Sequence, residues 1–229
     1  MPTPTQPPHD GVWCIVVAAG SGRRFGAAKQ YELLDDGERV VDRAVRIAAS
    51  VCDGVVLVLP QDERDDVAVE HATVCVSGGA TRSASVRAGL GAVPVDARIV
   101  LVHDAARPLA SPQLFRRVIQ AVRAGAAAVV PVVSVVDSVR DVDGGVVDRD
   151  RLRAVQTPQG FDAAGLRAAH RGEPEGSDDA GLVEAAGEAV VLVEGEPTNL
   201  KLTHAHDLEV ARVLVRLAAR QADPADSAS

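Results

Sequence analysis

The sequence predicts an α/β protein with a mostly parallel sheet, and three observations support this. Short apolar runs alternate with amphipathic stretches along most of the 229 residues. The apolar runs are continuous, as in parallel strands that are buried on both faces. One polar segment with two short alternating stretches around Asp143-Gly144-Gly145 breaks this rhythm and is typical of a β-hairpin. We therefore expect repeated βαβ units with one inserted hairpin.

The N-terminal half contains four of the predicted strands. We expect the strands at 12–18, 55–60, 73–77 and 98–103, and the helices at 38–51, 81–93 and 111–124. The first helix places Val41, Ala44, Val45 and Ala48 on one face, the spacing of a helix that packs on a sheet.

The C-terminal half continues the alternation around the hairpin. We expect strands at 127–133 and 189–194, helices near 162–171, 178–187 and 206–220, and the hairpin at about 137–150. Because a polar hairpin has no core to cover on its own subunit, we expect it to protrude as an arm that packs on a second copy in a homodimer. The Pro/Thr-rich residues 1–11 and the stretch "QADPADSAS" at 221–229 are predicted to be disordered tails around a single domain at 12–220.

Charge and hydropathy disfavour two classes of partner. The net charge is −8, from 24 basic and 32 acidic residues, whereas a nucleic-acid binder usually has a basic excess. A local basic cluster in an acidic protein is still compatible with a small anionic substrate. No apolar run approaches the roughly 20 residues of a spanning helix, and the N-terminus has no signal-like region, so a cytoplasmic protein without a membrane partner is expected.

Small and charged residues follow the predicted strands at the edge where open α/β sheets bind ligands. The segments concerned are Ala18, Ala19, Gly20, Ser21, Gly22, Arg23 and Arg24; Gly78 and Gly79; His103, Asp104, Ala105, Ala106 and Arg107; and Gly195 through Lys201. This collection of Gly, Ala, Arg and Lys with one carboxylate indicates a nucleotide and phosphate site.

The first glycine loop differs from the dinucleotide fingerprint. Arg23 and Arg24 occupy the expected helix start, and the next strand ends in Leu59-Pro60 without the acid that would bind a ribose. There is also no Gly-Lys-Ser/Thr of a P-loop. Two arginines and Lys29 behind exposed amides suit a triphosphate with a labile bond.

Asp104 is the candidate metal ligand, and zinc binding by His103, His204 and His206 is disfavoured because no further ligand cluster is visible. A carboxylate that faces a triphosphate suggests Mg²⁺, which takes one or two carboxylates plus phosphates and waters. The alternative is that Asp104 caps the following turn. The spacing of His204 and His206 predicts rings on different sides of a helix, so we expect no zinc site there.

Six motifs in order carry a resemblance to a known family. They are "AAGSGRRF", "KQY", "GGATRSASVRAGL", "LVHDAARP", "TPQGF" and "TNLKLT", spread over about residues 12 to 220. The chain resembles the 2-C-methyl-D-erythritol 4-phosphate cytidylyltransferases of the non-mevalonate isoprenoid pathway. The resemblance implies a Rossmann-like sheet of the nucleotidyltransferase type with a dimerising arm. It also implies CTP and Mg²⁺, and transfer of a cytidylyl group to methylerythritol phosphate with release of pyrophosphate.

The resemblance also implies residue roles. Arg24 and Lys29 would stabilise the transition state, while Arg149 and Lys201 would hold the acceptor phosphate. The implied nucleotide-binding residues are Ala18, Ala19, Gly20, Ser21, Gly22, Gly79, Ala80, Ser85, Asp104 and Ala105, with Asp104 also associated with the metal. Further implied acceptor-site residues are Arg107, Ser138, Thr157 and Ser177.

Three alternatives stay open. A cytidylyltransferase for another polyol phosphate, such as ribitol 5-phosphate, would need the same kinds of group. An NAD(P)-dependent oxidoreductase would use the loop from Gly20 to Gly26, and a regulatory nucleotide-binding module would carry no chemistry. No candidate general base stands out, which agrees with nucleotidyl transfer, because a phosphate dianion is already a nucleophile and catalysis depends on positioning and charge.

Overall fold

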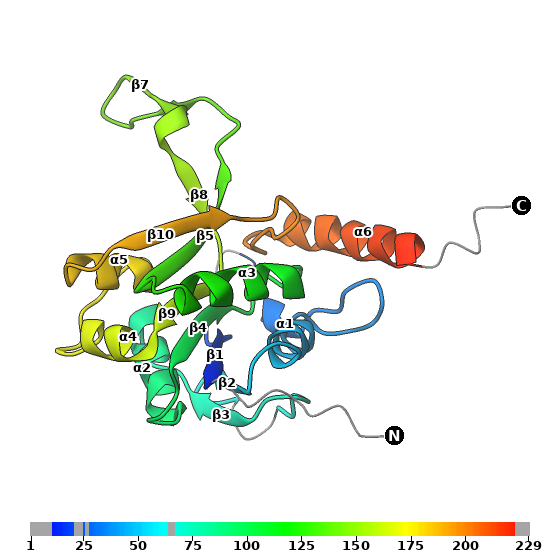
Figure 1. Cartoon of the computed structure of the whole chain (residues 1–229). Helices are drawn as coiled ribbons and strands as arrows, with labels where there is room; N and C mark the ends of the chain where they lie inside the picture. Colours follow the sequence, from blue (N-terminus) through cyan, green and yellow to red (C-terminus); the bar gives the residue numbers. More distant parts are fainter. Residues whose placement is uncertain (1–10, 21–24, 26–27, 64–66, 223–229) are drawn as a thin grey trace, which may run out of the picture.

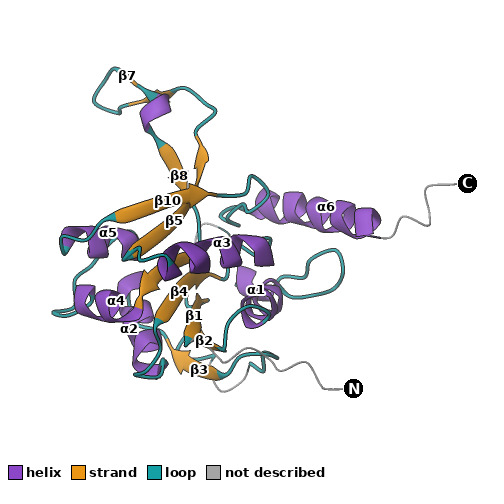
Figure 2. Cartoon of the chain, in the orientation of Figure 1, coloured by secondary structure: helices purple, strands orange, loops and turns teal. Residues whose placement is uncertain are grey.

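The computed structural model describes residues 11–20, 25, 28–63 and 67–222, and these form one large sheet with helices on both faces (Figures 1 and 2). The strands of this sheet are β1 (Val12–Val17), β2 (Gly54–Leu59), β3 (Val74–Ser77), β4 (Ile99–Asp104), β5 (Ala128–Ser134), β8 (Arg153–Val155), β9 (Gln159–Asp162) and β10 (Val190–Glu194). Their order is β10-β5-β9-β4-β1-β2-β3, with β8 beside β5.

The helices occupy the segments that the periodicity predicts. They are α1 (Val40–Ala49), α2 (Arg82–Ala92), α3 (Pro112–Arg123), α4 (Ala163–Ala169), α5 (Asp179–Ala185) and α6 (Ala205–Ala222), with short 3-10 turns η1 (Lys29–Tyr31) and η2 (Arg149–Arg151). Side chains of Thr81, Ser111, Asp162 and Asp178 accept a backbone N–H of the first turn and so begin α2, α3, α4 and α5.

The sheet is mixed, and its two antiparallel strands were not predicted. β1, β2, β3 and β4 pair in parallel, and β9 lies antiparallel between β4 and β5. β8 also runs antiparallel to β5. Strand β9 has only four residues, including Gly160, so it lacks an apolar run. A Cβ at Gly160 would lie 2.4 Å from Val118 Cγ1, so glycine allows α3 to pack closely on this strand.

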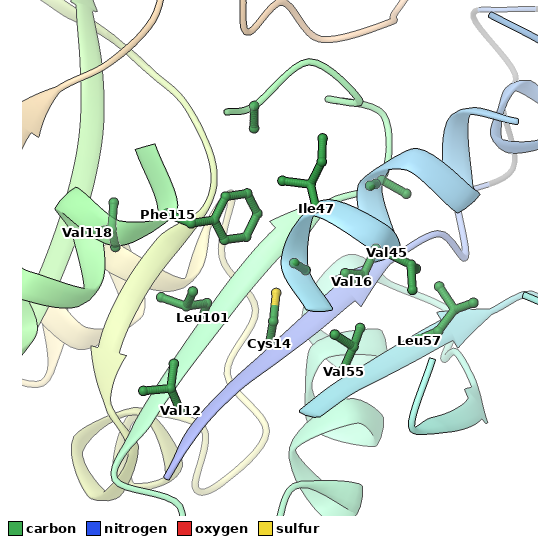
Figure 3. Close-up of a cluster of buried hydrophobic side chains, with 14 of the residues drawn as sticks. Val12, Cys14, Val16, Val45, Ile47, Val55, Leu57, Leu101, Phe115 and Val118 are labelled. Carbon is green, nitrogen blue, oxygen red and sulfur yellow. The ribbon is translucent and has the colours of Figure 1, made fainter. Parts of the chain in front are cut away.

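Alternate side chains of the strands build two cores. Cys14, Val16 and Leu101 point to the face covered by α1 and α3, where Phe115 fills the centre (Figure 3). Ile15 and neighbouring residues of β2, β4 and β5 point to the opposite face, covered by α2, α4 and α5. Burial on both faces explains the continuous apolar runs of the sequence.

A smaller third cluster attaches the C-terminal helix. Leu202, just before α6, and Leu208, within it, pack on Leu34 and Val40 at the start of α1. This contact brings the last loop of the chain beside the segment that follows β1.

The predicted arm is present as a hairpin. Strands β6 (Val139–Arg140) and β7 (Val146–Val147) pair antiparallel, and Figure 1 shows β7 standing well away from the main sheet. Val142 at its turn is 99% exposed.

The described structure extends slightly beyond the expected domain limits. The Gly11 carbonyl accepts hydrogen bonds from the amides of Arg98 and Ile99, and α6 continues to Ala222. The remaining residues of the two expected tails, 1–10 and 223–229, lie outside the described residues. Within the described part of the chain, every helix is too short or too polar to span a membrane.

Candidate active site

A pocket of about 560 Å³ lies at the carboxyl ends of β1, β3 and β4. It is lined by Val17, Ala18, Ala19, Gly20, Phe25, Lys29, Gln30, Gly79, Ala80, Thr81, Arg82, Ser85, Asp104, Ala105, Ala106, Lys201 and Thr203. Ten of the predicted site residues are in this set: Ala18, Ala19, Gly20, Lys29, Gly79, Ala80, Ser85, Asp104, Ala105 and Lys201. Three others, Ser21, Gly22 and Arg24, lie outside the described residues.

The double glycine after β3 packs tightly against the loop after β1. A Cβ at Gly78 would lie 2.4 Å from the Ala19 Cβ, and one at Gly79 would lie 2.5 Å from the Ala84 Cβ. Only glycine permits this approach, which places two loops against each other at one end of the pocket.

Ser85 and Thr81 fix the path of the double-glycine loop. The buried Ser85 hydroxyl donates to the Thr81 carbonyl at 2.9 Å and accepts the Gly79 amide at 3.1 Å. The Thr81 side chain accepts the Ala84 amide as the N-cap of α2. The pocket wall is therefore mostly backbone whose shape is set by two hydroxyls, an arrangement suited to recognising the edge of a base.

Asp104 is a buried carboxylate between two cations. Its Oδ2 lies 2.6 Å from Lys201 Nζ, and its Oδ1 lies 3.4 Å from Arg82 Nε. Burial alone would raise the pKa of Asp104, but Lys201, Arg82 and Arg107 together hold it well below the ordinary value. The following turn is closed by the Asp104 main-chain carbonyl, which accepts the Arg107 amide. The side chain is thus directed to the pocket and does not cap that turn.

His103 and Thr157 support Asp104 from within the protein. His103 Nε2 faces the Arg107 carbonyl at 3.2 Å, so this nitrogen carries the proton and donates. Nδ1 then accepts from the Thr157 hydroxyl at 3.1 Å, and that hydroxyl accepts the Asp104 amide at 3.1 Å. Burial lowers the pKa of His103 to about 4, which agrees with a neutral ring.

Both lysines of the chain line the pocket. Lys29 Nζ donates to the Leu202 carbonyl at 2.7 Å, and Lys201 Nζ pairs with Asp104. The Leu202 amide donates in turn to the Ala106 carbonyl at 2.8 Å. The segments "KQY", "HDAARP" and "TNLKLT" therefore meet at one place, although they are far apart in the sequence.

Asn199 and Gln156 explain why "TPQGF" accompanies "TNLKLT", and sequence reasoning missed both residues. The buried Asn199 amide donates to the Thr157 carbonyl at 2.9 Å. Gln156 Nε2 donates to the Glu196 carbonyl at 2.8 Å, and Gln156 Oε1 accepts the Glu196 amide at 3.0 Å. These bonds hold the loop of Lys201 against the strand-end segment of Thr157. Their only signal in the sequence is the pairing of the two motifs.

Five predicted acceptor-site residues do not line the pocket: Thr157, which supports Asp104 from within the protein, and four others. Arg107 donates to the carbonyls of Asn199 and Val155 at 2.7 and 3.0 Å, so its guanidinium fastens the last loop. Ser138 and Arg149 lie exposed on the arm, where Arg149 donates to the Val136 carbonyl. Ser177 lies exposed just before α5. The roles expected for these four residues stay predictions.

The prediction that the rings of His204 and His206 lie on different sides of a helix was wrong, whereas the expectation that they hold no zinc stays a prediction. The rings of His204 and His206 stack, with centroids 5.6 Å apart and planes 8° apart. His204 precedes the first residue of α6, so the helical spacing on which the expectation rested does not apply.

The donor set of the pocket fits a magnesium ion that is carried by a substrate. Among the described residues, no cluster of three or more histidine, cysteine or acidic side chains could hold a metal by itself. Asp104 nevertheless offers hard carboxylate oxygens at the pocket wall. Mg²⁺ commonly binds through one or two carboxylates and completes its shell with phosphates and water.

Comparisons with known proteins agree with this geometry. A family model described as "IspD: 2-C-methyl-D-erythritol 4-phosphate cytidylyltransferase" matches residues 12–217. Proteins of that name from Rhodococcus opacus and Saccharopolyspora erythraea are each 44% identical, over 89% of this chain and 95% and 99% of theirs. The crystal structure of the 2-C-methyl-D-erythritol 4-phosphate cytidylyltransferase from Thermus thermophilus superposes with a TM-score of 0.77 at 39% identity, over 89% of this chain and 98% of that one. The chain therefore belongs to the 2-C-methyl-D-erythritol 4-phosphate cytidylyltransferase family.

Proposed function

We propose that this chain transfers the cytidylyl group of CTP to 2-C-methyl-D-erythritol 4-phosphate and releases pyrophosphate. One observation carries the proposal beyond family membership. A single pocket unites the double-glycine loop, both lysines of the chain and one buried carboxylate. This combination of a backbone wall that can contact a base and clustered positive charge suits a nucleoside triphosphate that is attacked at its α-phosphorus.

In the proposed reaction, an oxygen of the acceptor phosphate attacks the α-phosphorus of CTP in line. A new P–O bond forms, the bond to the β-phosphate breaks, and pyrophosphate departs with the electron pair. The acceptor phosphate needs no base, so the protein contributes position and charge. Lys29, together with Arg24 of the first loop, neutralises the charge that gathers on the α-phosphate and the leaving group.

The nucleotide and the metal take the inner part of the proposed site. The backbone amides of Ala18, Ala19 and Gly20 are proposed to bind the phosphates, with Ser21 and Gly22 predicted from the sequence to share this task, while Gly79, Ala80 and Ser85 receive the cytosine. Asp104 and Ala105 lie where the ribose and the metal-bearing phosphates would be. Bound Mg²⁺ would reduce the repulsion between the triphosphate and the incoming phosphate.

The acceptor takes the outer part, beside Lys201. Thr157 uses its hydroxyl on His103 and on the Asp104 amide, so its proposed contribution is to orient Asp104. Arg107 and Ser177 are proposed to line the acceptor side. Ser138 and Arg149 lie on the arm, so they would complete the site of a partner subunit.

A homodimer through the arm at 137–150 follows from this assignment. Val136, Val142 and Val146 of the arm region are 77%, 99% and 72% exposed, and a second copy would cover them. Two-fold symmetry is the default for such a pair. The cytoplasmic location expected from the sequence stays a prediction.

Pyrophosphate release tests the proposed function. Purified protein and Mg²⁺ are incubated with each of the four nucleoside triphosphates and with methylerythritol phosphate, ribitol 5-phosphate or no acceptor. We expect release only with CTP and methylerythritol phosphate. Faster release with ribitol 5-phosphate would favour the other polyol phosphate. Equal release with ATP, or hydride transfer to a nicotinamide, would contradict the assignment.

A further inference from the structure

Arg82 links the pocket to a buried carboxylate–imidazole pair, Asp179 and His170, that the proposed reaction does not use. It is the first residue of α2 and lines the pocket. Its Nη1 lies 2.7 Å from Asp179 Oδ2, while its Nε lies 3.4 Å from Asp104 Oδ1. One guanidinium thus spans two carboxylates, one at the end of strand β4 and the other at the start of helix α5.

Away from the pocket, Arg82 pairs with Asp179, which is fixed in the protein interior. The Asp179 side chain is fully buried at the start of α5, and its Oδ1 lies 3.1 Å from His170 Nε2. His170, at the end of α4, is also buried. Since a carboxylate accepts, the imidazole donates through Nε2 and fixes one Asp179 oxygen, which leaves the other directed at Arg82. A guanidinium presents its donors in a rigid fork, so this anchor also sets the direction of Nε.

Toward the pocket, Arg82 pairs with Asp104, the same carboxylate that pairs with Lys201. The Lys201 side chain is 40% exposed, whereas that of Arg82 is 24% exposed and fixed by Asp179. In the proposed function, Lys201 turns toward the acceptor phosphate. That movement would remove one of the two protein cations that pair with Asp104, and Arg82 would then be the fixed cation that keeps the buried carboxylate oriented toward the metal-bearing substrate.

We infer that Arg82 is a positioning residue that keeps Asp104 paired and oriented when Lys201 engages the acceptor, with Asp179 and His170 as its anchor. The inference rests on the proposed function for the movement of Lys201. It also connects the two substrates, because α2 follows the double-glycine loop and α5 follows the Ser177 segment.

Kinetics of Arg82→Gln, Asp179→Asn and the double variant test the inference, with Arg87→Gln as the matched control. Arg87 lies on the same helix and donates to the Pro174 carbonyl and to Glu175, outside the pocket lining. We expect Arg82→Gln to lower kcat about tenfold or more and to raise KM for the acceptor more than KM for CTP. Asp179→Asn should act in the same direction and add little to Arg82→Gln, while Arg87→Gln should retain wild-type kinetics.

Arg82→Lys provides a second test in case Arg82→Gln does not fold. A lysine keeps the charge but reaches one carboxylate at a time, so it should fold and still show the raised acceptor KM. Calorimetry with CTP alone should give wild-type affinity in Arg82→Lys. Wild-type kinetics in Arg82→Lys or Arg82→Gln, or an equal loss in Arg87→Gln, would overturn the inference. A wild-type protein that turns over no acceptor would overturn the proposed function as well, so the two failures are distinct.

Discussion

Lys201 Nζ lies 2.6 Å from Asp104 Oδ2, although the two residues are 97 positions apart in the chain. The pair closes one side of the pocket and places an ammonium where an anionic acceptor would enter. It also neutralises a buried carboxylate that would otherwise repel a triphosphate. The charge balance of the site therefore depends on side chains that the fold, and not the sequence, brings together.

Lys29→Ala should lower turnover by at least about 10²-fold, the usual cost of removing one group that stabilises a developing oxyanion. The lysine lines the pocket and donates to the main-chain carbonyl of Leu202, so the fold should survive its removal. Steady-state pyrophosphate release and thermal unfolding check this. Arg212→Ala is the matched control, because Arg212 also donates to a distant carbonyl, that of Leu33, outside the pocket lining. Near-normal turnover of Lys29→Ala would remove this residue from the mechanism.

Asp104→Asn should raise the Mg²⁺ concentration for half-maximal turnover by about tenfold or more, because a neutral amide is a poor partner for a hard cation. The measurement is a Mg²⁺ titration at fixed CTP and acceptor. Asp162→Asn is the control, since Asp162 also ends a strand but caps α4, a task that Asn performs well. If both variants titrate like wild type, Asp104 has no connection with the metal.

Mixing inactive Lys29→Ala with inactive Arg149→Ala should restore about one quarter of wild-type activity, by counting on a two-fold dimer. In a mixed dimer, one site carries both lesions. The other takes its intact Lys29 and its intact Arg149 from different chains. Half of the dimers are mixed after random exchange. Absence of recovery, once subunit exchange is demonstrated by mass spectrometry, would exclude a site shared between subunits.

His103 should make the folded state less stable in mild acid. Its pKa is lowered by burial to about 4 from an ordinary value of 6.5. Between these values the unfolded chain binds a proton that the folded chain does not, so the contribution is complete above pH 6.5 and is lost as the pH falls toward 4. The loss is about 3 kcal/mol of the free energy of unfolding.

Denaturant unfolding at about pH 7 and about pH 4.5, on either side of most of this titration, measures the contribution. His103→Gln keeps a donor for the Arg107 carbonyl and should have a smaller difference between the two pH values. Val118→Ala removes core volume near the same sheet without a titratable group and should retain the wild-type difference. An unchanged difference in His103→Gln would mean that other groups cause the acid sensitivity.

The pattern of apolar residues along the sequence predicted those strands and helices whose side chains are buried in the two cores. Strands β1, β2, β4 and β5 and the helices that cover them appear as continuous or amphipathic apolar runs. Strand β9 escaped prediction because its four residues, Gln159–Asp162, derive their strand conformation from neighbours on both sides. Its glycine is required by contact with α3, which only the folded structure reveals.

The candidate site was also predictable only in part: the sequence indicated the residues at strand ends but not the contacts between distant side chains. Residues at strand ends, such as Asp104 and Gly79, were found because chain direction places them at one edge of the sheet. Arg82 was missed, although it lies in a recognised motif, since its meaning depends on Asp179, 97 positions away. Arg149 and Ser138 stay predictions, because their expected partners lie on a second copy of the chain.

The confinement of lysine to the pocket gives this chain a built-in spectroscopic label. All other basic side chains apart from histidine are arginine, so amine-selective methylation with isotopically labelled formaldehyde would add reporters only at Lys29, Lys201 and the N-terminus. Methylation keeps the ammonium charge. Two side-chain resonances would then report separately on the proposed nucleotide side, at Lys29, and on the proposed acceptor side, at Lys201, without a mutation.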